Sequence, residues 1–221
     1  KNGEKKFEKG ILAQSNRNIL YVDEINLLDD HIVDVLLDSA AMGVNSIERE
    51  GISFSHPAKF VLVGTMNPEE GDLRPQLLDR FGLVVDVAGE KETSRRVEVV
   101  KRRLEFEAEP EKFIKKYDKD EKELKERIEK SKKILKNVKC SDEMYEIAAK
   151  ISIALNVDGH RADISVIKTA ITIAAYEGRE NVSKEDMLRA AVLALPHRMR
   201  KTPFEDGVLE ESKLEKLIES L

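Results

Sequence analysis

The 221-residue chain is 41% hydrophobic, which is enough to bury a core in one large domain or two smaller ones. Its net charge of −5 argues against a dedicated nucleic-acid binder, and its single cysteine, Cys140, excludes an intrachain disulfide framework or a cysteine metal cluster. The sequence contains no apolar run near the roughly 20 residues of a membrane-spanning helix, so we expect a cytoplasmic protein with no membrane partner.

Three short apolar runs predict strands in the first part of the chain. They are ILYV at 19–22, FVLV at 60–63 and LVVDV at 83–87. Their nearly continuous apolarity is typical of parallel strands that are buried on both faces of a sheet. We therefore expect an α/β domain with a parallel sheet.

Two further elements fall between the first two predicted strands. Residues 29–41 repeat apolar side chains at helical spacing, and Asp29 or Asp30 could cap that helix. Within residues 45–56, apolar and polar side chains alternate on both sides of Glu50–Gly51. This pattern predicts a β-hairpin with the glycine in its turn.

The second part of the chain reads as helical throughout. Residues 111–137 are so highly charged that we expect a solvated helix or helix pair there. The other amphipathic segments are 91–107, 141–155, 163–177 and 183–195, and Ser183 with Asp186 resembles a capping box. The predicted domains are an α/β domain over 1–89 and an all-α domain over 90–221.

The first predicted strand ends in two adjacent acids, Asp23 and Glu24. Such a pair suits hydrolysis of a magnesium-bound nucleotide, because Asp23 could bind Mg²⁺ and Glu24 could orient and activate the attacking water. The alternative is an ordinary acidic junction between a strand and a loop.

Three other side chains are candidates for the same site. Asn67 follows the second strand, where its amide could reach a γ-phosphate, although it could also be a turn residue before proline. Arg80 lies before the predicted third strand and could act on a neighbouring subunit's nucleotide, or form an ion pair with Asp79 or Glu69. Arg161 opens a predicted helix and could contact the γ-phosphate or simply be solvated.

The order of these elements resembles that of AAA+ ATPases: acidic strand, hairpin, polar-ended strand, arginine and helical lid with a further arginine. The amino-acid sequence of residues 10–85 resembles that of the ATPase subunit of magnesium chelatase, the smallest subunit of that enzyme. Examples are the runs ILYVDEINLLDD and GTMNPEEGDLRPQLLDRFGL. The run ALPHRMRKTP at 194–203 also resembles that subunit. The similarity covers nearly the whole chain and is weakest over 107–139.

The resemblance implies a role for each candidate residue, with ATP and Mg²⁺ as cofactors. Asp23 and Glu24 match the Walker B acids, so Asp23 would bind the Mg²⁺ of Mg·ATP and Glu24 would be catalytic. Asn67 matches sensor 1 and Arg80 the arginine finger, both catalytic and nucleotide-binding. Arg161 matches the nucleotide-binding sensor 2 arginine. The hairpin matches the pre-sensor-1 hairpin of one AAA+ branch.

The resemblance also implies partners. The family is expected to form hexameric rings and to drive Mg²⁺ insertion into protoporphyrin IX on a porphyrin-binding subunit, with an integrin-like bridging subunit between them. A nucleic-acid partner is not expected, because the hairpin carries Glu48 and Glu50 against Arg49. A cobalt chelatase subunit, a MoxR-type AAA+ chaperone and a non-catalytic ring scaffold are the alternatives.

The sequence departs from the family pattern in one respect. The 221 residues do not contain the phosphate-binding Walker A loop, GxxxxGK[ST]. That loop supplies the backbone N–H groups and the lysine that hold the phosphates. We therefore expect that an N-terminal part of the core is missing from this chain and that the chain alone hydrolyses ATP negligibly.

Overall fold

A computed structural model of the chain describes residues 8–49, 51–199 and 214. The turn residue Glu50 and the last four residues of the 194–203 run lie outside the described residues. The chain divides into two compact units, Lys1–Phe81 and Gly82–Leu221, so the division comes slightly before the predicted boundary at Gly89. Each unit is described by itself below.

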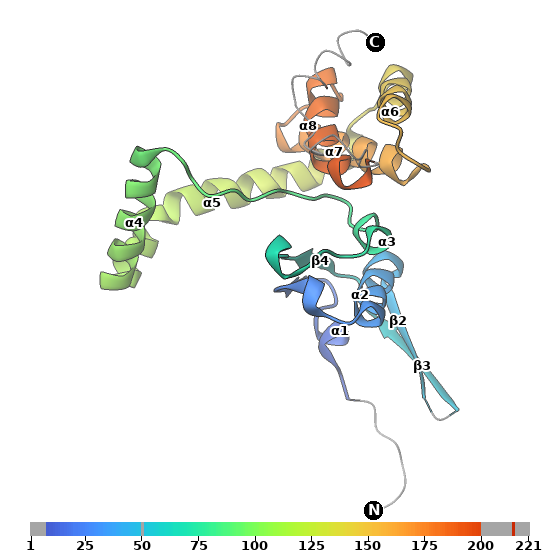
Figure 1. Cartoon of the computed structure of the whole chain (residues 1–221). Helices are drawn as coiled ribbons and strands as arrows, with labels where there is room; N and C mark the ends of the chain where they lie inside the picture. The colour runs from blue at the N-terminus through green and yellow to red at the C-terminus, as the bar shows by residue number, and fades with distance from the viewer. Residues whose placement is uncertain (1–7, 50, 200–213, 215–221) are drawn as a thin grey trace, which may run out of the picture. The chain divides into compact units, whose positions relative to one another are not determined.

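The first unit is built on two parallel strands. Strand β1 (Ile19–Val22) pairs in parallel with β4 (Val61–Gly64), in a register that sets Ile19 opposite Val61 and Val22 opposite Gly64. The crossover between them contains helix α2 (Asp30–Met42), which packs against β4 (Figure 1). The first two predicted strands and their parallel direction are therefore confirmed.

The predicted hairpin is also confirmed. Strand β2 (Val44–Arg49) pairs antiparallel with β3 (Ile52–Pro57), and the two extend from the end of α2 (Figure 1). Gly51 has a φ of 77°, a conformation that glycine adopts without the steric cost of a Cβ. The hairpin therefore turns where the sequence places its glycine.

The sheet is covered on one face only. The core on that face is formed by side chains of β1, the turn after β1, α2, the segment between β3 and β4, and the segments after β4. Its buried members are Leu20, Ile25, Val33, Leu36, Leu37, Ala58, Phe60, Leu73 and Leu77. The other face is 41–67% exposed at Ile19, Tyr21, Val61 and Val63. The prediction of strands buried on both faces is therefore wrong for the described residues, because no described element covers the second face.

The prediction of a third strand at 83–87 is wrong as well. This segment has no strand partner and makes one described backbone–backbone hydrogen bond, from the N–H of Val84 to the carbonyl of Leu193. Val87 is 94% exposed. An apolar run becomes a strand only when another backbone lies beside it, and no described strand does so here.

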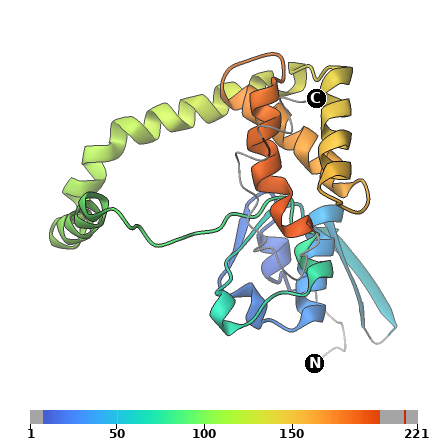
Figure 2. The same ribbon diagram turned by 45° about the horizontal axis from the view of Figure 1, so that its top comes forward.

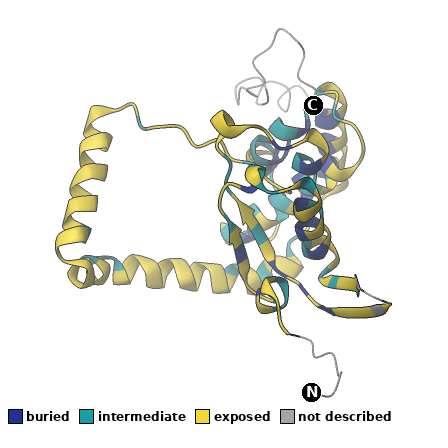
Figure 3. Ribbon diagram, turned by 60° about the horizontal axis from the view of Figure 1, so that its bottom comes forward, coloured by how far each residue is buried: buried dark blue, intermediate teal, exposed yellow. Residues whose placement is uncertain are grey.

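The second unit is all-helical, as predicted. Helices α6 (Asp142–Ala154), α7 (Arg161–Tyr176) and α8 (Lys184–Ala194) pack together around a shared core (Figure 2). Helix α5 (Pro110–Ile134) reaches α7 near its C-terminal end, and α4 (Thr93–Ala108) packs on α5. Helix α5, which covers most of the charged segment 111–137, has no buried residue, in agreement with the solvated helix expected there. Helix α4 has none either (Figure 3).

The predicted N-terminal cap is present at α8 and absent at α2. Ser183 and Asp186 form the predicted capping box of α8: the Ser183 hydroxyl accepts from the Asp186 amide, and the Asp186 carboxylate accepts from the Ser183 amide at 2.9 Å. Asp29 occupies the N-cap position of α2, but its side chain accepts no capping hydrogen bond.

Candidate active site at the ends of two parallel strands

The pairing of β1 with β4 continues past the ends of both strands. The N–H of Thr65 donates to the carbonyl of Val22 at 3.0 Å, and the N–H of Ile25 donates to the carbonyl of Thr65 at 2.9 Å. Asp23 and Glu24 lie between these two hydrogen bonds, so the backbone on either side of them is held against β4. This edge of the sheet is where the sequence places the acidic pair and the segment leading to Asn67.

The Asp23 carboxylate is fixed by two hydroxyl groups. Its Oδ1 accepts a hydrogen bond of 2.5 Å from Thr65 Oγ1 and one of 3.1 Å from the Tyr21 hydroxyl. These two bonds, that of Thr65 first, hold the pKa of Asp23 below its ordinary value, so the group is ionised at neutral pH. None of the described residues donates to Oδ2, which leaves that oxygen for a cation.

Glu24 has an unusual backbone conformation, with φ and ψ both 51°, in the left-handed region that non-glycine residues seldom occupy. Its N–H donates to Thr65 Oγ1 at 3.0 Å. The next residue, Ile25, is 1% exposed in the core and begins a 3-10 turn, Ile25–Leu27. The conformation is thus held on one side by Thr65 and on the other by a buried anchor, while the Glu24 side chain is exposed.

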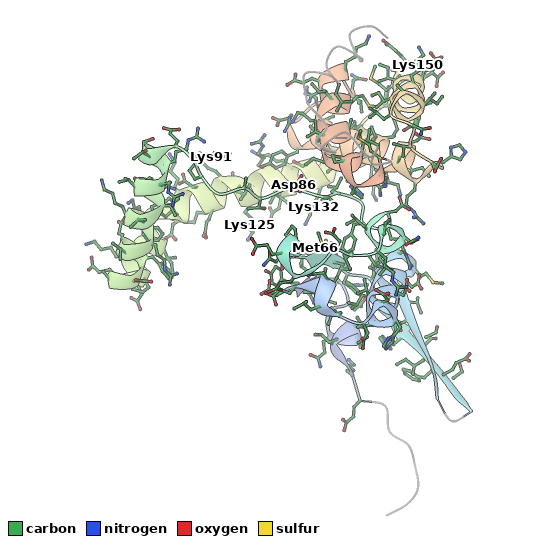
Figure 4. All side chains as sticks on the ribbon, viewed as in Figure 1. Met66, Asp86, Lys91, Lys125, Lys132 and Lys150 are labelled. Carbon is green, nitrogen blue, oxygen red and sulfur yellow. The ribbon has the colours of Figure 1, made fainter. Side chains whose placement is uncertain are left out.

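Asn67 follows β4 after Thr65 and Met66, the residue labelled in Figure 4. Its Oδ1 accepts from the N–H of Glu69 at 3.3 Å and so caps the 3-10 turn Pro68–Glu70. The parallel pairing of β1 with β4 brings Asn67 to the same edge as the two acids, but no described hydrogen bond joins its amide to either carboxylate. The turn role considered from the sequence is present in this structure.

Asn26 connects the two strand ends, a role that was not predicted. Its Nδ2 donates to the carbonyl of Gly71 at 2.8 Å and to the carbonyl of Asn67 at 3.4 Å. Its Oδ1 is buried without a hydrogen-bond partner among the described groups. The side chain therefore fixes the loop that contains Asn67 to the loop that contains the acids.

Arg80 lies just after helix α3 (Pro75–Leu78) and is bound to α2. Its Nη1 donates to Asp34 Oδ1 at 2.5 Å, and its Nη2 donates to Asp38 one turn further along that helix. The Arg80 side chain is 23% exposed. These aspartates are not among the partners considered from the sequence, and they hold the guanidinium within the first unit.

Arg161 belongs to the second unit, where it is the first residue of α7 and is exposed. Its position at a helix start agrees with the sequence. The two acids belong to the first unit, so the grouping of Arg161 with Asp23 and Glu24 stays a prediction.

The donor set at the strand ends fits magnesium better than a metal bound by protein side chains alone. No group of three or more His, Cys, Asp or Glu side chains gathers around a possible metal position in residues 8–49, 51–199 and 214. A single carboxylate with a free oxygen suits Mg²⁺, which keeps several waters and uses phosphate oxygens as ligands.

No described helix is long and apolar enough to cross a membrane.

The first unit has an acidic strand end paired with a second strand and a hairpin between the two, and the second unit is all-helical. These are the elements of the AAA+ fold. Residues 145–217 match the family described as AAA lid domain. A structure of a candidate ATPase from Cytophaga hutchinsonii has the same fold, with a TM-score of 0.68 at 16% identity over 97% of this chain and 68% of that chain.

The particular family follows from closer relatives. Residues 2–77 match the family described as magnesium chelatase, subunit ChlI. The chain is 56% identical to a magnesium-chelatase subunit ChlI homolog from Methanocaldococcus jannaschii over 99% of this chain and 60% of the relative. It is 50% identical to magnesium-chelatase subunit ChlI of Cyanophora paradoxa over 99% of this chain and 63% of the relative. The chain is similar to the ChlI family along nearly its whole length and spans about 60% of the length of these relatives.

The sequence missed Thr65, Tyr21 and Asn26 as parts of this site. Thr65 is a hydroxyl residue at a strand end, within the run GTMN. Its hydrogen-bond partner, Asp23, lies 42 residues earlier in the chain. Asn26 reaches Gly71 over 45 residues. Neither contact has a local pattern that the sequence could have revealed.

Proposed function

We propose that the protein containing this chain is the ATPase subunit of a magnesium chelatase. It hydrolyses ATP at the interfaces of a cytoplasmic hexameric ring and drives insertion of Mg²⁺ into protoporphyrin IX on a porphyrin-binding subunit, reached through a bridging subunit. The observation that carries this proposal is the ionised Asp23 carboxylate, held at the paired ends of β1 and β4 with one oxygen left for a cation. Similarity to the ChlI family supports the same function.

The two acids have different tasks in this proposal. Asp23 binds the Mg²⁺ of Mg·ATP through the oxygen that Thr65 and Tyr21 do not occupy. Bound magnesium neutralises phosphate charge during phosphoryl transfer. Glu24 orients the attacking water and accepts its proton through an exposed carboxylate whose backbone is fixed.

The remaining residues stabilise charge on the phosphates. The Asn67 amide acts from the neighbouring strand end, after its side chain leaves the cap of the 68–70 turn. Arg80 acts in trans on the nucleotide of the next subunit, and Arg161 acts from the lid. Two of the five guanidinium N–H groups of Arg80 are used by Asp34 and Asp38, so donors remain for a phosphate while α2 holds the group in place.

The missing phosphate-binding loop limits what the 221 residues do alone. Without a GxxxxGK[ST] sequence the chain has residues for the water and the magnesium but not the backbone cradle for the phosphates. The 221-residue chain by itself is therefore expected to hydrolyse ATP at no more than the background rate. Magnesium-dependent turnover by that chain which Glu24→Gln removes would contradict this expectation.

The experiment that tests the proposed function uses the complete gene product with the bridging and porphyrin-binding subunits of the same organism. Metallation of protoporphyrin IX is followed by fluorescence with ATP, without nucleotide, and with a non-hydrolysable ATP analogue. We expect magnesium porphyrin only with ATP. Insertion of Co²⁺ into a corrinoid instead, or ATP turnover that never produces a metallated tetrapyrrole, would refute the magnesium chelatase assignment.

A further inference from the structure

One hydroxyl group contacts both acidic residues of the candidate site. Thr65 Oγ1 donates to Asp23 Oδ1 at 2.5 Å and accepts from the N–H of Glu24 at 3.0 Å. A hydroxyl has one hydrogen to donate and lone pairs with which to accept, so these two contacts use it in both ways at once. No other described side chain bonds to both residues.

The position of this hydroxyl is set by the sheet and not by the site. The N–H and the carbonyl of Thr65 are both used in the continuation of the β1–β4 pairing, by Val22 and Ile25 respectively. Threonine is β-branched and has few side-chain rotamers, so a fixed backbone also restricts its hydroxyl. The strand pairing therefore presents Oγ1 to the acids with little freedom to move.

The two contacts have separate consequences. The bond to Asp23 occupies Oδ1, together with the Tyr21 hydroxyl, and leaves Oδ2 as the oxygen available to a cation. The bond from Glu24 holds a backbone with φ of 51°, a left-handed conformation that is unfavourable for a residue with a Cβ. Loss of the hydroxyl would release both acids together.

We propose that Thr65 is a positioning residue for ATP hydrolysis, which orients Asp23 through its carboxylate and Glu24 through its backbone. This inference rests on the proposed function. It assigns Thr65 no contact with the nucleotide. Groups that orient a metal ligand or a catalytic residue commonly contribute about 10- to 100-fold to activity when they are removed.

The test is a set of substitutions in the complete gene product. Thr65→Val keeps the shape and removes the hydroxyl, Thr65→Ala removes the hydroxyl without filling the space, and Thr65→Ser restores the hydroxyl. Thr172→Val, on the exposed surface of α7, is the matched control. We expect Thr65→Val and Thr65→Ala to lower kcat about 10- to 100-fold with little change in KM, and Thr65→Ser to keep kcat within about threefold.

A second measurement does not depend on activity. Hydrogen exchange of the Glu24 amide is measured by NMR in the 221-residue chain, where the hydroxyl of Thr65 accepts from that amide. Thr65→Val is expected to speed this exchange about fivefold, a ratio typical of the loss of one hydrogen bond, while Thr65→Ser and Thr172→Val leave it unchanged.

The outcomes separate this inference from the proposed function. Thr65→Val and Thr65→Ala with the kcat and Glu24 exchange of the parent protein would overturn the positioning role alone. Equal losses in Thr65→Ser and Thr65→Val would also overturn it, because packing and not the hydroxyl would then matter. If the parent protein and Glu24→Gln show the same ATP turnover, the proposed function fails, whatever the exchange rates are.

Discussion

Arg80 and Asp34 are joined by a hydrogen bond of 2.5 Å between Nη1 and Oδ1, which ties the chain after α3 to the side of α2. Asp38, one helical turn further on, accepts from the other terminal nitrogen of the same guanidinium. The two aspartates are 49% and 60% exposed, so the ion pairs contribute little to stability. Their more important effect is to fix the direction of Arg80, which we propose acts on the nucleotide of a neighbouring subunit.

A mixing experiment tests whether Arg80 acts in trans. Arg80→Ala and Glu24→Gln proteins are each expected to be inactive, because every site lacks one group. When they are mixed, an Arg80→Ala subunit beside a Glu24→Gln subunit has its own glutamate and receives its neighbour's arginine. We expect ATP turnover to reappear in the mixture, at a fraction of the parent rate, in a steady-state phosphate-release assay.

Two controls accompany the mixture. Arg80→Lys should behave like Arg80→Ala, since an ammonium group cannot reproduce the planar fork that reaches both aspartates. A double variant with both substitutions in one chain, mixed with itself, should stay inactive. A mixture that never exceeds the sum of its components would show that Arg80 does not act across an interface.

Gly64 lies where an added side chain would press on the site. A Cβ at this position would be 3.1 Å from Cγ2 and 3.2 Å from Cδ1 of Ile25, the buried neighbour of Glu24. Gly64→Ala is expected to lower the free energy of unfolding by about 1–2 kcal/mol and to reduce ATP turnover by moving Glu24. Gly89→Ala is the control, because nothing lies within 4 Å of its Cβ. A Gly64→Ala protein as stable and active as the control would contradict this packing.

Asn26 offers a test of the link between the two strand ends. Asn26→Asp replaces an N–H donor by a charged oxygen that faces the carbonyls of Asn67 and Gly71. We expect a loss of about 2–3 kcal/mol in the free energy of unfolding, against about 1 kcal/mol for Asn26→Ala, measured by urea denaturation. The reverse order, with the aspartate less harmful than the alanine, would mean that Asn26 does not donate to these carbonyls.

The second unit should lose stability in acid through Asp186. Burial raises the pKa of this carboxyl group, but hydrogen bonds from Arg179 and Ser183 outweigh it and hold the pKa below the ordinary 3.8. A pKa that folding lowers stabilises the folded state above the unfolded value. That contribution is lost as the pH falls below about 4 and through the folded pKa.

Thermal unfolding of Asp186→Ala across this pH range checks the sign. At pH 7 the substitution is expected to cost about 2 kcal/mol, because it removes the carboxylate half of the α8 capping box and the partner of Arg179. The difference from the parent protein should shrink below pH 4. Glu185→Ala, an exposed residue in the same turn, should change stability by less than about 0.5 kcal/mol at either pH. A constant difference from pH 7 to pH 3 would exclude this role for Asp186.

The elements that depend on residues close together in the chain could be predicted from the sequence. Strand β1 is an apolar run with polar ends, the hairpin has Gly51 where the backbone needs a positive φ, and the capping box of α8 joins residues three apart. In each case the pattern and the structure depend on the same few neighbours. The family resemblance, which the comparisons support, also came from continuous runs of residues.

Features that depend on distant residues could not be predicted in this way. Residues 83–87 have the composition of a strand, but a strand needs a backbone partner and the described residues provide none. The partners of Arg80 lie 46 and 42 residues earlier in the chain, and Thr65 bonds to Asp23 over 42 residues. Such contacts follow from packing α2 and β4 together, which the sequence pattern does not specify at the level of single side chains.

In the reaction that we propose, Glu24 activates water for ATP hydrolysis beside a magnesium ion bound by Asp23. The most direct measurement is ATP binding and single-turnover hydrolysis by the complete gene product and its Glu24→Gln variant, with Mg²⁺ present. We expect the variant to bind ATP as the parent protein does and to hydrolyse it at least about 100-fold more slowly. A Glu24→Gln protein that hydrolyses bound ATP at the parent rate would contradict it.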